Sequence, residues 1–297
     1  MDDQTIIDSS LDLMGFAAQH LPVVSVIHGK DKGKVFVISR PGTILGRDAE
    51  ADIPLDDHLI SRKHLSVCYT NTGSEESFGL TDLNSTNGSF VDQGQFTTCS
   101  IKPGQTVQIG KTVLAFSLKN KHEIESNKAL FETATIDPLT GVANRRWFMS
   151  RAEEEFAYTQ KKGVPLCLAM ADVDHFKKIN DSYGHQAGDH VLKETASLIK
   201  NSVRGHDYVG RYGGEEFILL LKELPEDRCL PVFDRMRTCI EKAEFIYQGQ
   251  SISVTMSFGV YPVEIELGLS VEQAITIADE RLYRAKENGR NQVVASD

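Results

Sequence analysis

Cysteine is scarce in this sequence, and its distribution argues against one class of protein. The chain has 297 residues and five cysteines, at positions 68, 99, 167, 229 and 239, with no CxxC pair. An odd, dispersed set does not make the disulfide framework of a small secreted domain. It is typical of reduced thiols in a cytosolic protein.

Long apolar runs and an excess of positive charge are lacking as well. No uncharged apolar run is long enough to span a bilayer, and the acidic start, MDDQ, lacks the basic region of a secretory signal. The formal net charge of -10 argues against nonspecific binding to nucleic acid or to a membrane surface. We therefore expect a cytoplasmic protein with no nucleic acid partner and no membrane insertion.

The chain does contain enough apolar sequence for about two domains. Hydrophobic residues make up 40% of it, so sizeable cores are possible. Composition and patterning predict four segments: a flexible polar tail over 1–20, an all-β domain over 21–118, a helical linker over 119–136 and an α/β domain over 137–297.

The first domain consists of short apolar runs separated by turn residues, with no long helical period. This spacing predicts an all-β sandwich. The runs lie at 23–27, 34–38, 64–69, 107–109 and 113–116.

The linker is rich in helix formers and lacks glycine and proline. It has too few apolar residues to assign a coiled coil. A helix that couples the two domains and a plain connector therefore remain alternatives.

The second domain alternates helical and extended segments, which predicts an α/β sheet with helical cover. We expect one strand to end at 172 and another to cover 252–260. The expected helices cover 145–161, 190–203, 230–243 and 271–287, with a further helix in the region 176–189.

A hairpin over 208–221 is expected to organise this domain. Gly213 and Gly214 are strong turn residues, because glycine enters positive φ without steric cost. Glu215 and Glu216 follow them, and then comes an apolar run typical of a buried strand. For the hairpin alone, a surface turn with two solvated glutamates is an equally good reading.

A second acidic site decides between these readings. The apolar run 166–171 leads into Asp172 and Asp174. Two strand-borne acidic clusters can meet at one sheet edge and hold a divalent metal through oxygen ligands. This is the layout for phosphoryl or nucleotidyl transfer.

The motif GGEEF at 213–217, with DPLTG at 137–141, resembles the signature of the GGDEF family of diguanylate cyclases over roughly 135–294. The resemblance implies a polymerase-palm-like, ferredoxin-like fold. It also implies that two GTP molecules, one on each of two domains, condense into cyclic di-GMP with release of two pyrophosphates. The active form would then be a homodimer.

The resemblance implies a metal site as well. Mg²⁺, or Mn²⁺ in its place, would be held by Asp172, the backbone carbonyl of Val173, and Glu216 or Glu215. Glu215 is our candidate for accepting the proton of the attacking 3′-hydroxyl group. Asp174 is expected on the opposite face, because side chains alternate along a strand.

Four phosphate contacts are implied by the same resemblance: the backbone near Phe176 and the side chains of Lys177, Lys286 and Arg290. Lys177 is therefore also included among the catalytic residues. Lys286 and Arg290 are equally explained as cations at a helix C-terminus, so only the family match singles them out.

Asn180 and Asp189 are expected to read the base. Guanine offers two donors, N1–H and the 2-amino group, which a carboxylate accepts. Adenine presents an acceptor at N1, which Asp189 would repel. GTP is therefore the expected substrate.

The segment RGHD at 204–207 lies at a fixed offset before Gly213 and matches the family's RxxD inhibitory site. Arg204 would contact a guanine edge or a phosphate of cyclic di-GMP. Asp207 would accept a hydrogen bond from its guanine.

Three loops of the first domain together resemble a forkhead-associated (FHA) domain, a reader of phosphothreonine peptides. They carry GR at 46–47, SRKH at 61–64 and NSTNGS at 84–89, and IKPGQTVQIG at 101–110 matches the family's closing strands.

The chemistry of these loops suits that ligand. The fork of Arg47 and the hydroxyl of Ser61 suit a phosphate with two negative charges. By resemblance, Arg62, Thr86 and Asn87 line the same surface. His64 is expected to brace a loop from inside, and Ser89 stands where the family usually has threonine.

Thr5, in the acidic tail, is a candidate ligand for this domain when phosphorylated. FHA domains read the third residue after the phosphothreonine, which is Asp8 here. Tethering would raise the local ligand concentration to about millimolar. An unmodified Thr5, with a partner protein as the ligand, is the alternative.

Together these features predict a phosphorylation-responsive diguanylate cyclase. Two rivals stay open: a catalytically silent nucleotide receptor, and a scaffold that recruits partners through its FHA domain.

Overall fold

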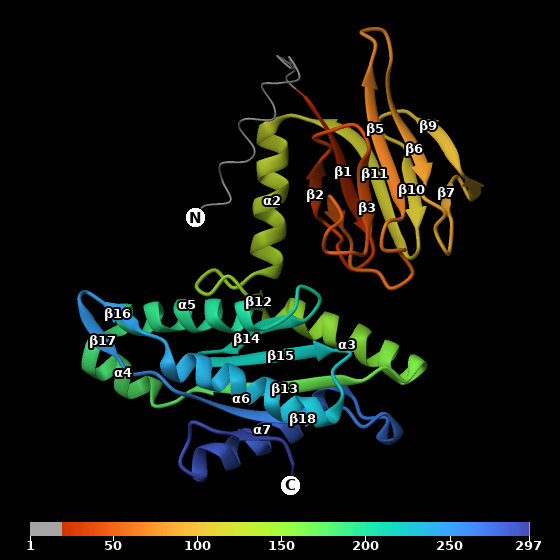
Figure 1. The fold of residues 1–297 in the computed structure, drawn as a ribbon. Helices are drawn as coiled ribbons and strands as arrows, with labels where there is room; N and C mark the ends of the chain where they lie inside the picture. The colour runs from red at the N-terminus through yellow and green to blue at the C-terminus, as the bar shows by residue number, and fades with distance from the viewer. Residues whose placement is uncertain (1–19, 297) are drawn as a thin grey trace. The chain divides into compact units, whose positions relative to one another are not determined.

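The computed structural model describes residues 20–296, and the chain divides into two compact units, Met1–Glu132 and Thr133–Asp297. The first unit is built mainly of strands, and the second combines a sheet with helices (Figure 1). The predicted order of an all-β domain followed by an α/β domain is confirmed. The predicted tail, with Thr5, lies almost entirely outside the described residues.

Two sheets form the sandwich of the first unit. Their strand orders are β2-β1-β11-β10-β7-β8 and β4-β3-β5-β6-β9. The strands are β1 (Leu21–His28), β2 (Val35–Val37), β3 (Thr43–Gly46), β4 (Ile53–Pro54), β5 (Leu65–Asn71), β6 (Glu76–Asp82), β7 (Ser89–Val91), β8 (Gly94–Phe96), β9 (Thr98–Ile101), β10 (Thr106–Ile109) and β11 (Thr112–Lys119).

The core of the sandwich follows from the alternation of side chains along each strand. Fully buried and partly exposed residues alternate over the first six positions of β11, as expected when one face of a strand is packed and the other meets water. Leu45, Phe78 and Phe116 are completely buried, and the rings of Phe78 and Phe116 lie 5.3 Å apart.

Helix α2 (Lys121–Thr135) occupies the predicted linker. Its start is a reciprocal cap: Glu123 N donates to Asn120 Oδ1, and Asn120 N donates to Glu123 Oε2, both at 2.8 Å. Phe131 lies under the ammonium group of Lys34, which is 5.9 Å from the ring centre. Most of the helix surface is exposed.

The second unit is organised by a six-stranded sheet of order β12-β14-β15-β13-β18-β19, with helices on both faces (Figure 1). Its strands are β12 (Ala143–Asn144), β13 (Leu166–Val173), β14 (Tyr208–Gly213), β15 (Glu216–Lys222), β18 (Met256–Pro262) and β19 (Val293–Val294), and a separate hairpin pairs β16 (Phe245–Tyr247) with β17 (Gln250–Ile252). The helices are α3 (Arg145–Lys162), α4 (Phe176–Tyr183), α5 (His185–Ser202), α6 (Glu226–Lys242) and α7 (Val271–Glu287).

All eight residues of the central strand β13 are buried, because both of its faces are covered. Leu168 and Met170 belong to the cluster that contains residues of α3 and α7. Ala169 and Ala171 belong to the cluster that contains residues of α4, α5 and α6. Helix α7 lies so close to β18 that a β-carbon on Gly259 would sit 2.0 Å from the Ala278 carbonyl oxygen.

The boundaries differ from expectation at three places. The helix expected over 190–203 is α5, which begins at His185, because Gly184 ends α4 and separates the two helices. Helix α6 begins at Glu226 and not near 230, with Pro225 as its N-cap and Pro231 inside it. Proline suits a helix start, but Pro231 gives up one backbone hydrogen bond. The strand expected over 252–260 is divided between β17 and β18, and β16 pairs with the first of these pieces.

Candidate active site

The tip of the β14–β15 hairpin is a two-residue turn. Gly213 pairs with Glu216 across the two strands, so the turn residues are Gly214, with φ of +47°, and Glu215. The predicted hairpin is present, but Gly213 is the last residue of its strand and not part of the turn, because the ladder extends one residue further than the two glycines suggest.

An arginine that the motif analysis did not single out holds this turn in place. Arg211 donates to the Gly214 carbonyl from Nε at 2.9 Å and from Nη2 at 2.7 Å. Its Nη1 is 3.2 Å from a carboxylate oxygen of Asp137, and Asp137 begins the DPLTG motif. Arg211 therefore ties the two motifs together.

Strand register brings the two predicted acidic sites side by side. Asp172, next to the last residue of β13, lies opposite Glu216, the first residue of β15. Directly opposed residues of antiparallel strands have β-carbons about 5 Å apart. We call Asp172, Glu215 and Glu216 the acidic edge.

The acidic edge carries more negative charge than the protein itself compensates. Asp172 is 6% exposed. Burial raises the pKa of its carboxyl to about 6, with Lys286 opposing the shift and the neighbouring glutamates adding to it. Burial also raises the pKa of Glu216. Lys286 Nζ lies 2.8 Å from Asp172 Oδ2. Burial, Asp279 and Glu215 raise the pKa of Glu216, whereas Lys286 and Arg145 lower it, so the nearby cations do not offset all of the negative charge.

These residues fit a divalent cation. Within residues 20–296, no three acidic, histidine or cysteine side chains are gathered closely enough to hold a metal by themselves. The predicted ligand set needs only two carboxylates and the Val173 carbonyl, all at one sheet edge. Such oxygen donors, with their charge uncompensated, are the kind that Mg²⁺ and Mn²⁺ take.

Asp174 lies outside the acidic edge, but alternation along the strand is not the reason: residues two apart in a strand share a face, and β13 ends at Val173, so Asp174 belongs to the segment after the strand. It is 3% exposed and accepts hydrogen bonds from Ser257 Oγ at 2.7 Å and Thr255 Oγ1 at 2.8 Å. A third hydrogen bond comes from the Asn291 backbone N–H at 3.0 Å. Its oxygens therefore serve the fold.

The predicted phosphate contacts lie on α4 and at the end of α7. Phe176 is the first residue of α4 and follows the last residue of β13 by three positions, so the helix start, with its free N–H groups, is close to that strand end in the sequence. Lys177 is exposed. Lys286 lies in the last turn of α7, and Arg290 has a positive φ of 66°.

The two predicted base readers are set by a close approach of α4 and α5. A β-carbon on Gly188 would lie 2.0 Å from Asn180 Oδ1, so any larger residue there would displace the Asn180 side chain. Asp189 follows Gly188 and is exposed, whereas Asn180 is half-buried. Gly188 is a residue that the motif analysis did not identify.

The RxxD segment borders a pocket of about 520 Å³. The Asp207 side chain is 5% exposed, and its oxygens accept from the backbone N–H groups of Arg204 and Lys222, both at 2.9 Å. Arg204 is exposed. Two arginines of α6 that the sequence did not point to, Arg228 and Arg235, line the same pocket.

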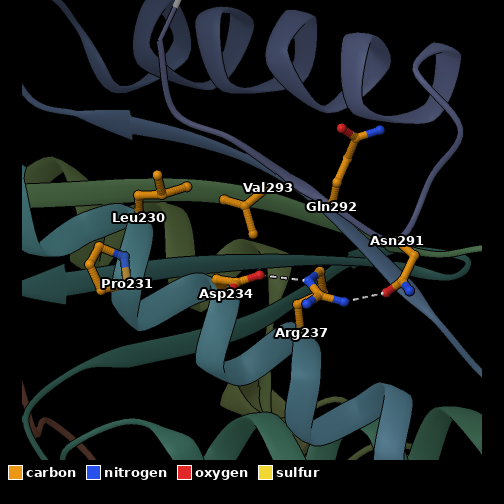
Figure 2. A pocket seen from close by; sticks show the side chains of 7 residues that line it. All are labelled: Leu230, Pro231, Asp234, Arg237, Asn291, Gln292 and Val293. Atoms are coloured by element: carbon orange, nitrogen blue, oxygen red, sulfur yellow. Dashed lines mark hydrogen bonds and ion pairs between the residues drawn. The ribbon is translucent and has the colours of Figure 1, made fainter.

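A second pocket, of about 560 Å³, lies between α6 and the segment after α7, with Arg237 and Asn291 joined across it (Figure 2). Its lining residues are Leu230, Pro231, Asp234, Arg237, Asn291, Gln292 and Val293.

In the first unit, hydrogen bonds join the loops that resemble those of FHA domains. Ser61 Oγ accepts from the Thr86 N–H at 3.0 Å, and Asn87 Nδ2 donates to the Leu59 carbonyl at 2.7 Å. The backbone N–H of Arg47 donates to the Ser61 carbonyl at 3.1 Å. The side chains of Arg47 and Arg62 are exposed.

His64 lies beneath these loops and is completely buried. Its Nδ1 accepts from the Ser61 N–H at 3.1 Å, and Nε2 is 3.2 Å from the Gly88 carbonyl. Burial lowers its pKa. Ser89, also fully buried, donates to Asp82 at 2.6 Å. Both side chains support the loops from inside.

Comparison with known proteins separates the two units. The family model described as "Diguanylate cyclase, GGDEF domain" matches residues 134–292. A second model, described as "Inner membrane component of T3SS, cytoplasmic domain", matches residues 25–120, and that domain is FHA-like. Within the described residues, no helix is long and apolar enough to cross a membrane.

Among curated relatives, diguanylate cyclase A of Treponema denticola is 38% identical over 174 residues, which is 58% of this chain and 47% of the relative. Diguanylate cyclase DgcP of Pseudomonas aeruginosa is 40% identical over 163 residues, 54% of this chain and 24% of the relative. The chain thus spans between about a quarter and about half of the length of these two relatives.

The second unit also resembles a solved structure. The coiled coil and GGDEF domain of DgcB from Caulobacter crescentus, in complex with c-di-GMP, superposes with a TM-score of 0.56 at 29% identity, covering 59% of this chain and 93% of that one. Because the matching family model covers more than half of the sequence and includes the acidic edge, the chain belongs to the GGDEF family of diguanylate cyclase domains.

Proposed function

We propose that this protein is a diguanylate cyclase that condenses two GTP molecules into cyclic di-GMP and two pyrophosphates. One observation carries the proposal: in a GGDEF-family sheet, buried Asp172 lies opposite Glu216 and forms an ion pair with Lys286. This arrangement concentrates uncompensated negative charge beside a cation that can meet phosphate.

The proposed metal is Mg²⁺, or Mn²⁺, held by Asp172, the Val173 carbonyl, and Glu216 or Glu215. When bound, it would neutralise the triphosphate and make the attacking 3′-hydroxyl group more acidic. Glu215, at the turn of the hairpin, is the proposed acceptor of the hydroxyl proton. The turn is fixed by Arg211, which would keep this carboxylate in place.

The chain's own cations supply the remaining phosphate contacts. Lys177 and the backbone at Phe176 approach from the start of α4, and Lys286 and Arg290 from the end of α7. Lys286 is paired with Asp172. A triphosphate therefore competes for it and, once bound, gains a cation that stabilises the leaving pyrophosphate.

Asn180 and Asp189 are proposed to select guanine, since Asn180 lies against Gly188, the residue before Asp189, where α4 meets α5. Each domain holds one substrate, so the attacking hydroxyl group must come from a second copy of the domain. The catalytic form is therefore proposed to be a homodimer.

Product feedback is proposed at the pocket beside the RxxD segment. Arg204 faces solvent there, and the pocket adds Arg228 and Arg235, so it suits an anionic ligand such as cyclic di-GMP. Because both oxygens of Asp207 already accept backbone hydrogen bonds, any contact with the product would use their remaining lone pairs. Arg204→Ala should relieve product inhibition and leave initial turnover nearly unchanged. Equal inhibition of variant and parent would exclude this site.

The first unit is proposed to bind a phosphothreonine peptide through Arg47, Ser61, Arg62, Thr86 and Asn87. Capture of such a peptide could control the pairing of the catalytic domains. Phosphorylated Thr5 of the chain's own tail remains the proposed ligand, in cis or between two subunits, and a partner protein is the alternative.

The central test is incubation of the purified chain with GTP and Mg²⁺, followed by chromatographic identification of the product. Cyclic di-GMP, and no cyclic product from ATP alone, supports the proposal. GTP binding without turnover would favour the silent receptor. Binding of a phosphopeptide without any nucleotide binding would favour the scaffold.

A further inference from the structure

The segment that follows α7 has an unusual backbone. Gly289, Arg290 and Asn291 have φ values of 108°, 66° and 45° in succession. For most residues with a side chain, the left-handed region costs about 1–2 kcal/mol, although asparagine tolerates it. Arg290 is therefore the strained residue of the three, and its conformation persists only where surrounding contacts hold it.

Backbone hydrogen bonds hold this segment on one side. The Arg290 N–H donates to the Ala285 carbonyl at 2.9 Å. The Asn291 N–H donates to Asp174 Oδ2 at 3.0 Å. Asp174 is two residues beyond Asp172, so this bond ties the segment to the strand end that carries the acidic edge.

The side chain of Asn291 is held from α6. Arg237 Nη1 donates to Asn291 Oδ1 at 2.9 Å, and Asn291 Nδ2 donates to Glu241 Oε1 at 2.7 Å. Arg237 is itself fixed by Asp234 at 2.7 Å and Glu241 at 2.9 Å, and its side chain is only 15% exposed. Figure 2 shows Arg237 reaching from α6 to Asn291, with Asp234 on its other side.

We infer that Arg237 and Asn291 are positioning residues for GTP binding: Arg237, from α6, holds Asn291, and Asn291 fixes the strained backbone that presents the preceding residue, Arg290, to the triphosphate. This inference rests on the proposed function, which gives Arg290 its phosphate contact. A long cation whose backbone is fixed relative to Asp172 loses less freedom when it meets a phosphate. The alternative is that this network only closes the end of the domain and affects stability alone.

The test is GTP affinity in the presence of Mg²⁺, measured by calorimetry on the full chain, with turnover measured in parallel. Arg237→Ala should weaken GTP binding about tenfold, the scale expected on removal of a residue that orients a ligand-binding group without itself contacting the ligand. Its former partners Asp234 and Glu241 are 56% and 41% exposed, so no buried charge is left alone. The melting temperature should fall by no more than about 4 °C, the scale of a 1 kcal/mol loss.

A double-variant cycle separates positioning from general destabilisation. If Arg237 acts through Arg290, Arg237→Ala should add less than about twofold to the loss of affinity already caused by Arg290→Ala. Asn291→Gly, which removes the side chain but keeps the positive φ favourable, should reproduce the Arg237→Ala effect. Lys242→Ala, on the same helix and exposed, is the matched control and should bind GTP like the parent.

Three results overturn the inference. The first is an unchanged GTP affinity in Arg237→Ala, and the second is a double variant whose fold-loss of affinity equals the product of the fold-losses of the two single variants. The third is no GTP binding by the parent. The third also removes the proposed function. A parent that binds GTP but forms no cyclic di-GMP refutes only the proposed function, and the affinity cycle then still decides the role of Arg237.

Discussion

The two candidate sites of this protein, one in each unit, differ in whether their charged groups are exposed to water or buried. The loops of the first unit are joined by neutral groups that satisfy one another, as Ser61, Thr86 and Asn87 show, and their arginines stay in water. The acidic edge of the second unit buries Asp172 opposite Glu216 and leaves negative charge uncompensated. The polar groups that join the loops of the first site satisfy one another, whereas burial of Asp172 in the second site disfavours its charged form.

Asp172→Asn should remove the main difference between the two sites, the buried charge of the acidic edge. Loss of a metal ligand should reduce cyclic di-GMP synthesis at least about 1,000-fold, because a catalytic metal contributes several kcal/mol to the barrier. The fold should survive, since the variant also removes a buried charge from beside Glu216. Product chromatography and thermal unfolding measure the two effects.

Asp174→Asn is the matched control for that variant. Its carboxylate accepts three hydrogen bonds in a buried position, so this variant should lose about 1–3 kcal/mol of unfolding free energy. If Asp172→Asn and Asp174→Asn lost equal unfolding free energy, the Asp172 carboxylate would be stabilised in the fold as well as that of Asp174, which would contradict the comparison.

Ser61→Ala tests the other side of the comparison. Removing the hydroxyl group should weaken binding of a phosphothreonine peptide about 10- to 100-fold, the cost of one hydrogen bond to a charged group. Stability should change by less than about 1 kcal/mol, because the site is near the surface. Fluorescence anisotropy with a peptide of residues 1–12 phosphorylated at Thr5 is the measurement. Binding of the unphosphorylated peptide with the same affinity would refute Thr5 as the ligand.

The apparent affinity for Mg²⁺ should fall about tenfold from pH 7 to pH 5. Since the pKa of Asp172 is raised to about 6, this carboxyl is mostly ionised at pH 7 and mostly protonated at pH 5, and protons compete with the metal. Calorimetric titration at the two pH values gives the ratio. An affinity independent of pH would contradict the raised pKa.

The stability of the metal-free protein should fall as the pH rises, whereas the affinity for Mg²⁺ should rise. The folded-state pKa of Asp172 lies above its ordinary value of 3.8, so its contribution to stability is full below about pH 4. That contribution is lost as the pH rises through 6. Asp172→Asn should flatten this part of the pH profile, measured by urea unfolding.

Ser89→Thr should have the smallest effect. The added methyl group lies in a buried strand position, where a β-branched residue suits the pleat, and the hydroxyl can keep its bond to Asp82. We expect a gain of about 0.5 kcal/mol in unfolding free energy, with unchanged phosphopeptide affinity. A loss of more than about 1 kcal/mol would show that the sandwich has no room for the methyl group.

The sequence predicted the parts of the second site that depend on local pattern. A strand ending at Asp172 and a hairpin bearing Glu216 are readable because strands have period two and glycine marks turns. Their meeting at one sheet edge was inferred from chemistry, and the strand register now shows how it arises. The turn was misplaced by one residue, since glycine can also occupy a strand.

The supporting residues could not be predicted in this way, because their partners are distant in the sequence. Arg211 bonds Asp137 from 74 residues away, and the Asn291 backbone bonds Asp174 from 117 residues away. Gly188 resembles any helix glycine until Asn180 is seen against it. Nothing local distinguishes such residues from ordinary surface charges and small residues.

Because α7 and β18 are in close contact, a substitution at the uncharged position Gly259 can change the electrostatics of the acidic edge. At Gly259 the helix nearly touches the strand backbone, so a single methyl group there must push α7 outward. Lys286 lies eight residues beyond Ala278 on that helix, about 12 Å along its axis, and would move with it, away from Asp172. For protein engineering, the pairing of Lys286 with Asp172 could therefore be adjusted from a site that contains no ionisable atom.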